Sequence, residues 1–139
     1  MAHDQLDIED QPSNEDIQFF ESCIYEYNIA STGVEDGRPL SVIIRGGDER
    51  VAGLFGHTWG GVFEVKTLWV REDLRGRGLG KRLLAAAEEE ARGRGCSQSI
   101  LETHSFQAPA FYPARGYILC GVVDNFPVGH QHLFFAKGL

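Results

Sequence analysis

The feature that most constrains this sequence is a glycine-rich turn that joins an apolar segment to an amphipathic one. The turn reads RGRGLGK over residues 75–81, after a strand expected at Val62–Val70 and before a helix expected to begin near Gly78. Glycines at alternate positions permit positive φ angles and leave backbone N–H groups free to point at one small object. The first turn of a helix adds unpaired N–H groups and the positive end of its dipole. The pattern therefore predicts a cradle for a phosphate or pyrophosphate.

Two common phosphate-binding motifs do not fit this turn. A P-loop needs Ser or Thr after its lysine, but Lys81 is followed by Arg82. The dinucleotide fingerprint needs a third glycine at the position that Lys81 occupies. The pattern R-x-x-G-x-G does fit, with Arg75, Gly78 and Gly80. A glycine-rich helix start flanked by solvated basic residues stays open as the alternative interpretation.

Length and composition indicate a globular chain. The 139 residues are 42% hydrophobic and 24% charged, which is ordinary for one domain. We expect residues 1–12 to be a flexible lead-in and residues 13–139 to form a single domain. The net charge of −7 argues against a nucleic-acid partner and is compatible with attraction of cationic amines. Because the sequence has no apolar run of about 18 residues, we expect no membrane span.

The cysteines and histidines indicate neither disulfides nor a metal site. The three cysteines are odd in number and have no C-x-x-C spacing, so we expect free thiols in a reducing, cytoplasmic compartment. The five histidines do not cluster with the cysteines in the sequence, so we expect no metal.

Hydrophobic periodicity and turn residues predict an alternating order of elements. We expect helices at 14–30, from 78 to about 92 and at 107–114, and strands at 40–45, 50–55, 62–70, 96–103, 117–123 and 132–137. The first three strands should be antiparallel, and the strand after the second helix should run parallel to 62–70. We also expect the aromatic residues of the first helix to pack in the core, with Tyr25, Tyr27 and Asn28 at the edge of an acceptor pocket as the alternative. Glu88–Glu90 should point mostly outward.

The central strand carries a conspicuous carboxylate. Strict alternation places Val62, Glu64, Lys66, Leu68 and Val70 on one face, and both faces are mostly apolar. We therefore expect the strand to be covered on both sides, where a carboxylate must be solvated, paired or functional. Pairing with Lys66, a place at a wet rim and a catalytic role all remain open for Glu64.

The loop pattern and the order of elements resemble the GNAT N-acetyltransferase superfamily. Its acetyl-CoA loop carries Q/R-x-x-G-x-G/A between a strand and a helix, as the sequence does at residues 75–80. Family members also commonly carry N-x-x-A-x-x-x-Y followed by G-F/Y; the matching residues are Ala108, Tyr112, Gly116 and Tyr117, with Ser105 at the asparagine position. The segment FQAPAFY with a later P-x-G-H looks like a bacterial branch of the family that acts on small molecules or is uncharacterised.

The resemblance implies a fold and a set of sites. The fold is α/β (α+β), with a single mixed, mostly antiparallel sheet of about six or seven strands flanked by helices on both faces. Where the central strand splays from its parallel neighbour, freed backbone groups would hold the pantetheine arm and polarise the thioester carbonyl. The implied acetyl-CoA-binding residues are Leu68, Trp69, Val70, Arg75, Gly76, Arg77, Gly78, Leu79, Gly80, Lys81, Ser105 and Ala108.

The resemblance also implies catalytic roles. Tyr112 is the candidate general acid, because a phenol can protonate a departing thiolate. Glu64 is the leading candidate general base, directly or through water. For each histidine, a surface or hydrogen-bonded structural role is the preferred interpretation.

The implied function is direct transfer of the acetyl group of acetyl-CoA to a primary amine, without a metal. The acceptor would be a small molecule, such as a polyamine, an amino acid or an aminoglycoside-like compound, or a protein amine. Family members are often homodimers, so a homodimer is expected. Two alternatives are a non-catalytic acyl-CoA-binding sensor or partner module, and transfer of a different acyl group.

Overall fold

The computed structural model describes residues 4–139, which divide into two compact units with the boundary between Glu35 and Asp36. The first three residues of the expected lead-in, 1–12, lie outside the described residues. The single domain expected at 13–139 stays a prediction.

The described part of the first unit contains one α-helix, α1 (Asn14–Thr32). Ser13 caps it, because its side chain accepts a hydrogen bond from the backbone N–H of Asp16. Gly33 ends the helix in the left-handed conformation (φ 73°), where its N–H bonds the carbonyl of Ile29. The helix predicted at 14–30 is confirmed.

The apolar residues of α1 are exposed within the first unit. No residue of this helix is buried, and Phe19, Phe20, Ile24 and Tyr27 are exposed. The expectation that its aromatic side chains pack in the core stays a prediction. Helical periodicity identifies an apolar face, but it does not say which surface that face will meet.

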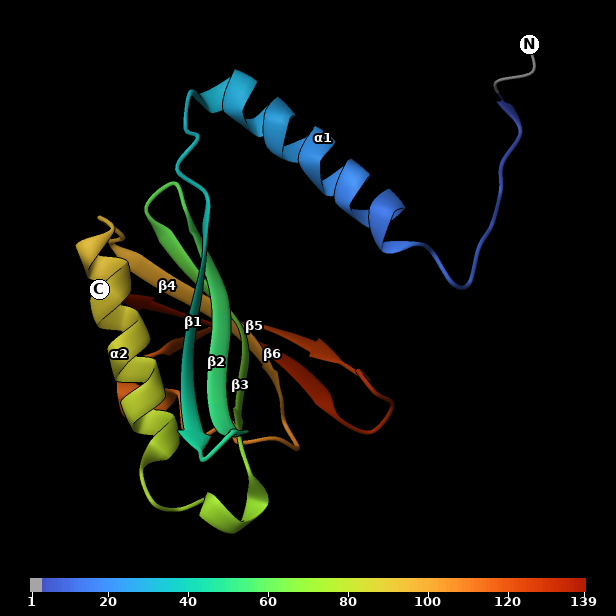
Figure 1. The fold of residues 1–139 in the computed structure, drawn as a ribbon. Coiled ribbons are helices and arrows are strands. Elements are labelled where there is room, and N and C mark those ends of the chain that lie inside the picture. Colours follow the sequence, from blue (N-terminus) through green and yellow to red (C-terminus); the bar gives the residue numbers. More distant parts are fainter. Residues whose placement is uncertain (1–3) are drawn as a thin grey trace. The chain divides into compact units, whose positions relative to one another are not determined.

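The second unit is a six-stranded mixed sheet with one long helix (Figure 1). Its elements are β1 (Arg38–Gly46), β2 (Glu49–Trp59), β3 (Val62–Val70), η2 (Glu72–Leu74), α2 (Leu79–Gly93), β4 (Gln98–His104), η3 (Pro113–Arg115), β5 (Ile118–Asp124) and β6 (Gln131–Gly138).

The strand order is β1-β2-β3-β4-β6-β5. Every neighbouring pair is antiparallel except β3 and β4, which are parallel because α2 crosses between them. The predicted fold, one mixed and mostly antiparallel sheet flanked by helices, is confirmed.

The core lies between α2 and the sheet. Residues of α2 at helical spacing, Leu83, Leu84 and Ala87, are at most 1% exposed and share one hydrophobic cluster with Phe63 and Phe135. Full burial of a large apolar side chain contributes about 1.5–3 kcal/mol. This packing fixes α2 and the loop before it against the central strands.

One charged residue of α2 joins this core. Glu88 is 5% exposed, so the expectation that Glu88–Glu90 point mostly outward was wrong for Glu88, whereas Glu89 and Glu90 are exposed. Its carboxylate is 2.8 Å from the Tyr117 hydroxyl and 3.0 Å from Nζ of Lys137. The Tyr117 hydroxyl is also 2.8 Å from Oγ of Ser99. Burial of Glu88 is tolerated because these partners satisfy its charge.

The helix predicted at 107–114 is shorter than expected. The structure has turns in this segment and a single 3₁₀ turn, η3. Pro109 and Pro113 explain the difference, since proline lacks an N–H and blocks a continuous α-helix.

The central strand does not alternate strictly. Phe55 pairs with Thr67 and Gly56 pairs with Val65, so Lys66 is an extra residue on β3. This β-bulge shifts the phase of the strand: Phe63 and Val65 are buried in the core, whereas Trp69 is 46% exposed. The expected alternation of side chains between the two faces of β3 was therefore wrong beyond Val65. The expectation that both faces of this strand are covered was also wrong.

Candidate active site

The bulge lies where β3 separates from β4. The parallel pairing runs from Val62 with Gln98 to Val65 with Leu101 and goes no further. Beyond that point the second half of β3 pairs with β2 alone. The expected splay of the two strands is therefore present, and it leaves backbone groups of β3 without partners from β4.

A cleft of about 1060 Å³ opens at this splay. One side is formed by β3 and the loop into α2, and the other by the end of β4 and the segment before η3. Eleven of the residues predicted from the sequence line it: Leu68, Trp69, Val70, Arg75, Gly76, Gly78, Leu79, Gly80, Lys81, Ala108 and Tyr112.

The glycine loop has the geometry of an anion cradle. Gly76 and Gly78 have φ angles of 75° and 81°, which other residues adopt at a cost. Gly78 is the N-cap of α2 and offers no side-chain cap, so the first N–H groups of the helix, at Leu79–Lys81, remain for a ligand. Their partial positive charge and the nearby cations suit a pyrophosphate.

Arg75 fixes the loop to the end of the central strand. Its Nε donates a hydrogen bond to the carbonyl oxygen of Val70 at 2.9 Å. On the other side of the loop, a Cβ added to Gly80 would stand 3.5 Å from the Phe111 ring, in ordinary contact. The loop is thus held between β3 and the segment that carries Tyr112.

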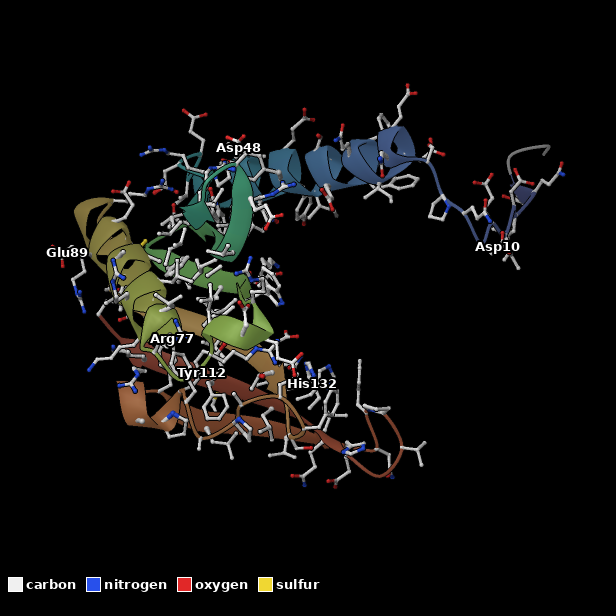
Figure 2. All side chains as sticks on the ribbon, turned by 60° about the horizontal axis from the view of Figure 1, so that its bottom comes forward. Asp10, Asp48, Arg77, Glu89, Tyr112 and His132 are labelled. Atoms are coloured by element: carbon white, nitrogen blue, oxygen red, sulfur yellow. The ribbon has the colours of Figure 1, made fainter. Side chains whose placement is uncertain are left out.

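Tyr112 combines burial with access to the cleft. It is 9% exposed, lines the cleft and packs its ring against Phe111, Tyr117 and Phe135. Burial raises the pKa of its phenol above the usual value of 10, so the hydroxyl keeps its proton at neutral pH. No described residue hydrogen-bonds this hydroxyl, which leaves its proton available to a ligand. In the view of Figure 2, Tyr112 lies between Arg77 and His132.

Three predicted site residues are outside the described lining of this cleft. Glu64 pairs with Lys66 on β3, and of the two only Lys66 lines the cleft. Ser105 accepts a hydrogen bond from the backbone N–H of Gln131 through its Oγ. Arg77 is exposed in the glycine loop. Their predicted roles stay predictions.

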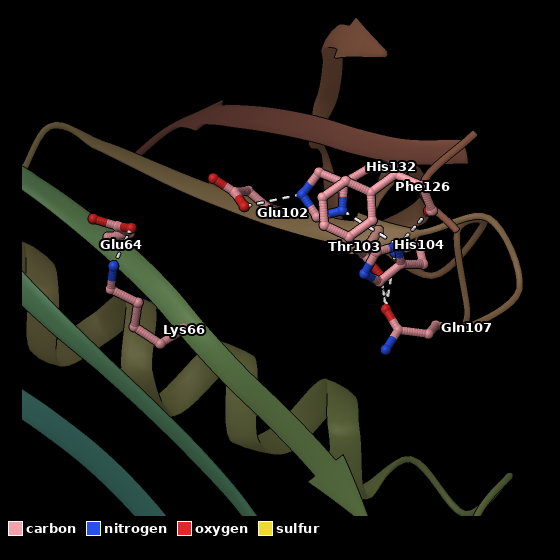
Figure 3. Close-up of polar contacts among 8 residues, drawn as sticks. All are labelled: Glu64, Lys66, Glu102, Thr103, His104, Gln107, Phe126 and His132. Carbon is pink, nitrogen blue, oxygen red and sulfur yellow. Dashed lines mark hydrogen bonds and ion pairs between the residues drawn. The ribbon is translucent and has the colours of Figure 1, made fainter. Parts of the chain in front are cut away.

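The structure adds a polar row that the sequence reasoning missed. Nε2 of His132 is 2.9 Å from the Glu102 carboxylate, and its Nδ1 is 3.3 Å from Nδ1 of His104. The same His104 nitrogen is 3.0 Å from the carbonyl oxygen of Phe126. Glu102, His104 and His132 all line the cleft, and Figure 3 shows them on β4 and β6, across from Glu64 and Lys66 on β3.

A signal for this row exists in the sequence. Glu102 and His104 are two residues apart on a strand, so they share a face. His132 begins the last strand, but only the register that pairs His104 with His132 brings the rings together. That register is set by the tertiary structure and cannot be predicted from the sequence of either strand alone.

Within residues 4–139, no group of three or more His, Cys, Asp or Glu side chains is arranged to hold a metal ion. Neither described α-helix is both long and apolar enough to span a bilayer. The three cysteines are free thiols.

Known proteins resemble this chain over most of its length. The family model described as Acetyltransferase (GNAT) family matches residues 4–117. Acetyltransferase Atu2258 of Agrobacterium fabrum (strain C58 / ATCC 33970) is 43% identical over 112 residues, which cover 80% of this chain and 82% of that protein. Blasticidin-S acetyltransferase of Streptomyces morookaense is 43% identical over 115 residues, 78% of this chain and 83% of that protein.

Solved structures agree with this assignment. A crystal structure of an acetyltransferase from Bacillus cereus ATCC 14579 superposes with a TM-score of 0.82 and 28% identity, over the whole of both chains. A crystal structure from Agrobacterium tumefaciens superposes with a TM-score of 0.89 and 32% identity, over 97% of this chain and 99% of that one. The chain therefore belongs to the GNAT acetyltransferase family.

Proposed function

We propose that this enzyme transfers the acetyl group of acetyl-CoA directly to a primary amine of a small cationic molecule. The observation that carries the proposal is the single cleft that joins the glycine cradle, the splayed end of β3 and Tyr112. The cradle would bind the pyrophosphate. Backbone groups of Leu68–Val70 that have no partner from β4, other than the Val70 carbonyl that Arg75 binds, would hold the pantetheine arm and polarise the thioester carbonyl. Arg77, which is exposed in the glycine loop, would add positive charge near the pyrophosphate.

The identity of the acceptor is supported by charge and by relatives. The chain has a net charge of −7, which attracts cations. One relative at 43% identity is named blasticidin-S acetyltransferase, and the fold is shared with an aminoglycoside 6'-N-acetyltransferase complexed with coenzyme A, at 21% identity and a TM-score of 0.65. A small-molecule amine is therefore the favoured acceptor class, ahead of a protein amine.

The reaction balances with the residues of the cleft. A base takes one proton from the acceptor ammonium, and the neutral nitrogen attacks the thioester carbon. The new C–N bond forms as the C–S bond breaks, and the Tyr112 hydroxyl gives its proton to the departing sulfur. The second proton lost by the nitrogen restores the phenol, so one proton is released in each turnover. Glu64 is the base predicted from the sequence. Because its side chain is not among the described residues that line the cleft, it would act through a water molecule.

The test is a pair of measurements on the full chain. Titration calorimetry with acetyl-CoA and with CoA measures binding, and release of the CoA thiol measures turnover with blasticidin S, kanamycin, spermidine and a lysine peptide as probe amines. We expect binding in the micromolar range and turnover with at least one of the small amines. Absence of acetyl-CoA binding by the folded protein would contradict the proposal.

The same experiment separates the alternatives. Tight CoA binding without turnover of any amine would favour a non-catalytic sensor or partner module. Faster transfer from propionyl-CoA or succinyl-CoA than from acetyl-CoA would show that the acyl group is different. The homodimer and the cytoplasmic location stay predictions, and light scattering after gel filtration measures the first.

A further inference from the structure

The row formed by Glu102, His132 and His104 has a defined proton order. Nε2 of His132 faces a carboxylate, which only accepts, so this nitrogen carries a proton. Nδ1 of His104 faces the carbonyl oxygen of Phe126, which also only accepts, so Nδ1 carries the proton there. When both rings are neutral, Nδ1 of His132 therefore holds a lone pair, and it faces the N–H of His104 at 3.3 Å.

This order leaves one lone pair free in the cleft. A neutral imidazole protonated at Nδ1 has its lone pair on Nε2. No described residue hydrogen-bonds Nε2 of His104, and His104 lines the same cleft as Tyr112. The ring is held in place by Phe106, stacked at 5.1 Å with an interplanar angle of 17°, and by Phe126 at 5.1 Å.

We propose that His104 is the general base that deprotonates the acceptor amine, and that His132 and Glu102 are positioning residues that stabilise the charge it gains. The proposal rests on the acetyl transfer proposed above. The ammonium of the acceptor gives a proton to Nε2 of His104, and the Nδ1 proton of His104 can then pass to Nδ1 of His132. The positive charge ends on His132, next to the Glu102 carboxylate, and no other reactant is needed.

The surroundings favour this row over Glu64 as the base. The side chain of His132 is 12% exposed and that of Glu102 is 57% exposed, so the contact between them is shielded from water on the His132 side only. Glu64 is already paired with Lys66, which lines the cleft from β3. The positive charge of Lys66 disfavours the approach of an acceptor ammonium to Glu64. His130 contacts the edge of the Phe106 ring but does not hydrogen-bond with this row.

The aromatic rings around the row also indicate where the acceptor binds. Phe106 and Phe126 pack on the two histidines, and Phe106 itself lines the cleft. Phe106 and Glu102 line the same cleft, and a cation there is attracted both by the quadrupole of the ring and by the charge of the carboxylate. An ammonium held here lies beside the lone pair of His104.

The first test is the pH profile of kcat/KM with the probe amine that the wild type turns over best. We expect His104→Gln to lower kcat about 100-fold and to remove the acidic limb of the profile. Glu102→Gln and His132→Gln should lower kcat about 3–10-fold, and Glu102→Gln should move the acidic limb to lower pH, because the charged pair loses its counter-ion. His130→Gln is the matched control and should leave the midpoint of the limb unchanged.

The second test does not need turnover. Two-dimensional ¹H–¹⁵N spectra of the imidazoles in the protein alone report which nitrogen of each ring is protonated. We expect the Nδ1–H tautomer for His104 and the Nε2–H tautomer for His132, and we expect the His132 signals to move in Glu102→Gln.

Two results would overturn the inference. One is an acidic limb that survives in His104→Gln, or that disappears in Glu64→Gln instead. The other is a His104 ring with its proton on Nε2. If the wild type does not bind acetyl-CoA, the proposed function is wrong. The spectra would still show which nitrogen of His104 and of His132 carries a proton.

Discussion

The hydroxyl of Tyr117 lies 2.8 Å from the Glu88 carboxylate, inside the core between α2 and the sheet. A phenol facing a buried carboxylate resists ionisation. Burial, with Glu88 adding to it, raises the pKa of Tyr117 well above 10. Because of this pair, the free energy of unfolding should depend on pH in the alkaline range.

The sign of this dependence is set by the raised pKa. The neutral phenol is favoured in the folded state, so its contribution is complete below the unfolded pKa of about 10 and is lost as pH rises toward the folded value. We expect wild-type stability to fall above about pH 10. Tyr117→Phe should cost about 1–2 kcal/mol at pH 7.5 and show a shallower alkaline decline. Urea unfolding at pH 7.5 and 10.5 measures both, with Tyr27→Phe, an exposed phenol, as control. Equal slopes for wild type and Tyr117→Phe would contradict the prediction.

The bulge on β3 depends on a glycine opposite it. A Cβ added at Gly56 would clash with the backbone carbonyl oxygen of Glu64 and would stand 2.8 Å from Cε1 of Phe63. Gly56→Ala should therefore destabilise the fold by about 2–3 kcal/mol, since overpacking against backbone cannot relax cheaply. Gly53→Ala on the same strand is the control, because its Cβ would be 3.4 Å from its nearest neighbour, the carbonyl oxygen of Val42. Equal free energies of unfolding for the two variants would show that the bulge does not need Gly56.

The glycine cradle predicts a loss of binding that can be separated from backbone strain. Gly78 has a φ angle of 81°, so alanine and glutamate there should carry the same strain, about 1–2 kcal/mol. Only Gly78→Glu adds bulk and negative charge where the pyrophosphate is expected. We expect its acetyl-CoA affinity, measured by calorimetry, to be at least about tenfold weaker than that of Gly78→Ala, because like charges repel. Equal affinities for the two variants would place the pyrophosphate elsewhere.

The proposed acid predicts a loss of chemistry without a loss of binding. Tyr112→Phe keeps the ring that packs in the core and removes a hydroxyl that no described residue hydrogen-bonds. We expect acetyl-CoA affinity within about twofold of wild type and kcat lower by about 100-fold. Tyr117→Phe is the matched control, since it removes a neighbouring buried hydroxyl that faces Glu88. Unchanged turnover in Tyr112→Phe would remove this residue from the mechanism.

Local pattern was enough to predict much of the fold and the cradle. The helix at 14–30, the amphipathic helix after the glycine loop, the parallel strand after that helix and the glycine loop itself were all predicted from the sequence and are present. Each depends on residues within one or two turns of one another, where steric limits and periodicity act directly. Tyr112 and most of the loop residues therefore appear together in one cleft.

Tertiary structure decided what the local pattern could not. The bulge at Lys66 arises from the register of β2 on β3, and it sets the phase of the strand and the point where the cleft opens. The pairing of His104 with His132 depends in the same way on the register of β4 on β6, between residues 28 positions apart. Burial of Glu88 depends on Tyr117 and Lys137 arriving from distant strands. By itself the sequence determined most of the elements and the glycine loop, whereas cross-strand register, which no single segment encodes, decided which polar side chains meet in the cleft.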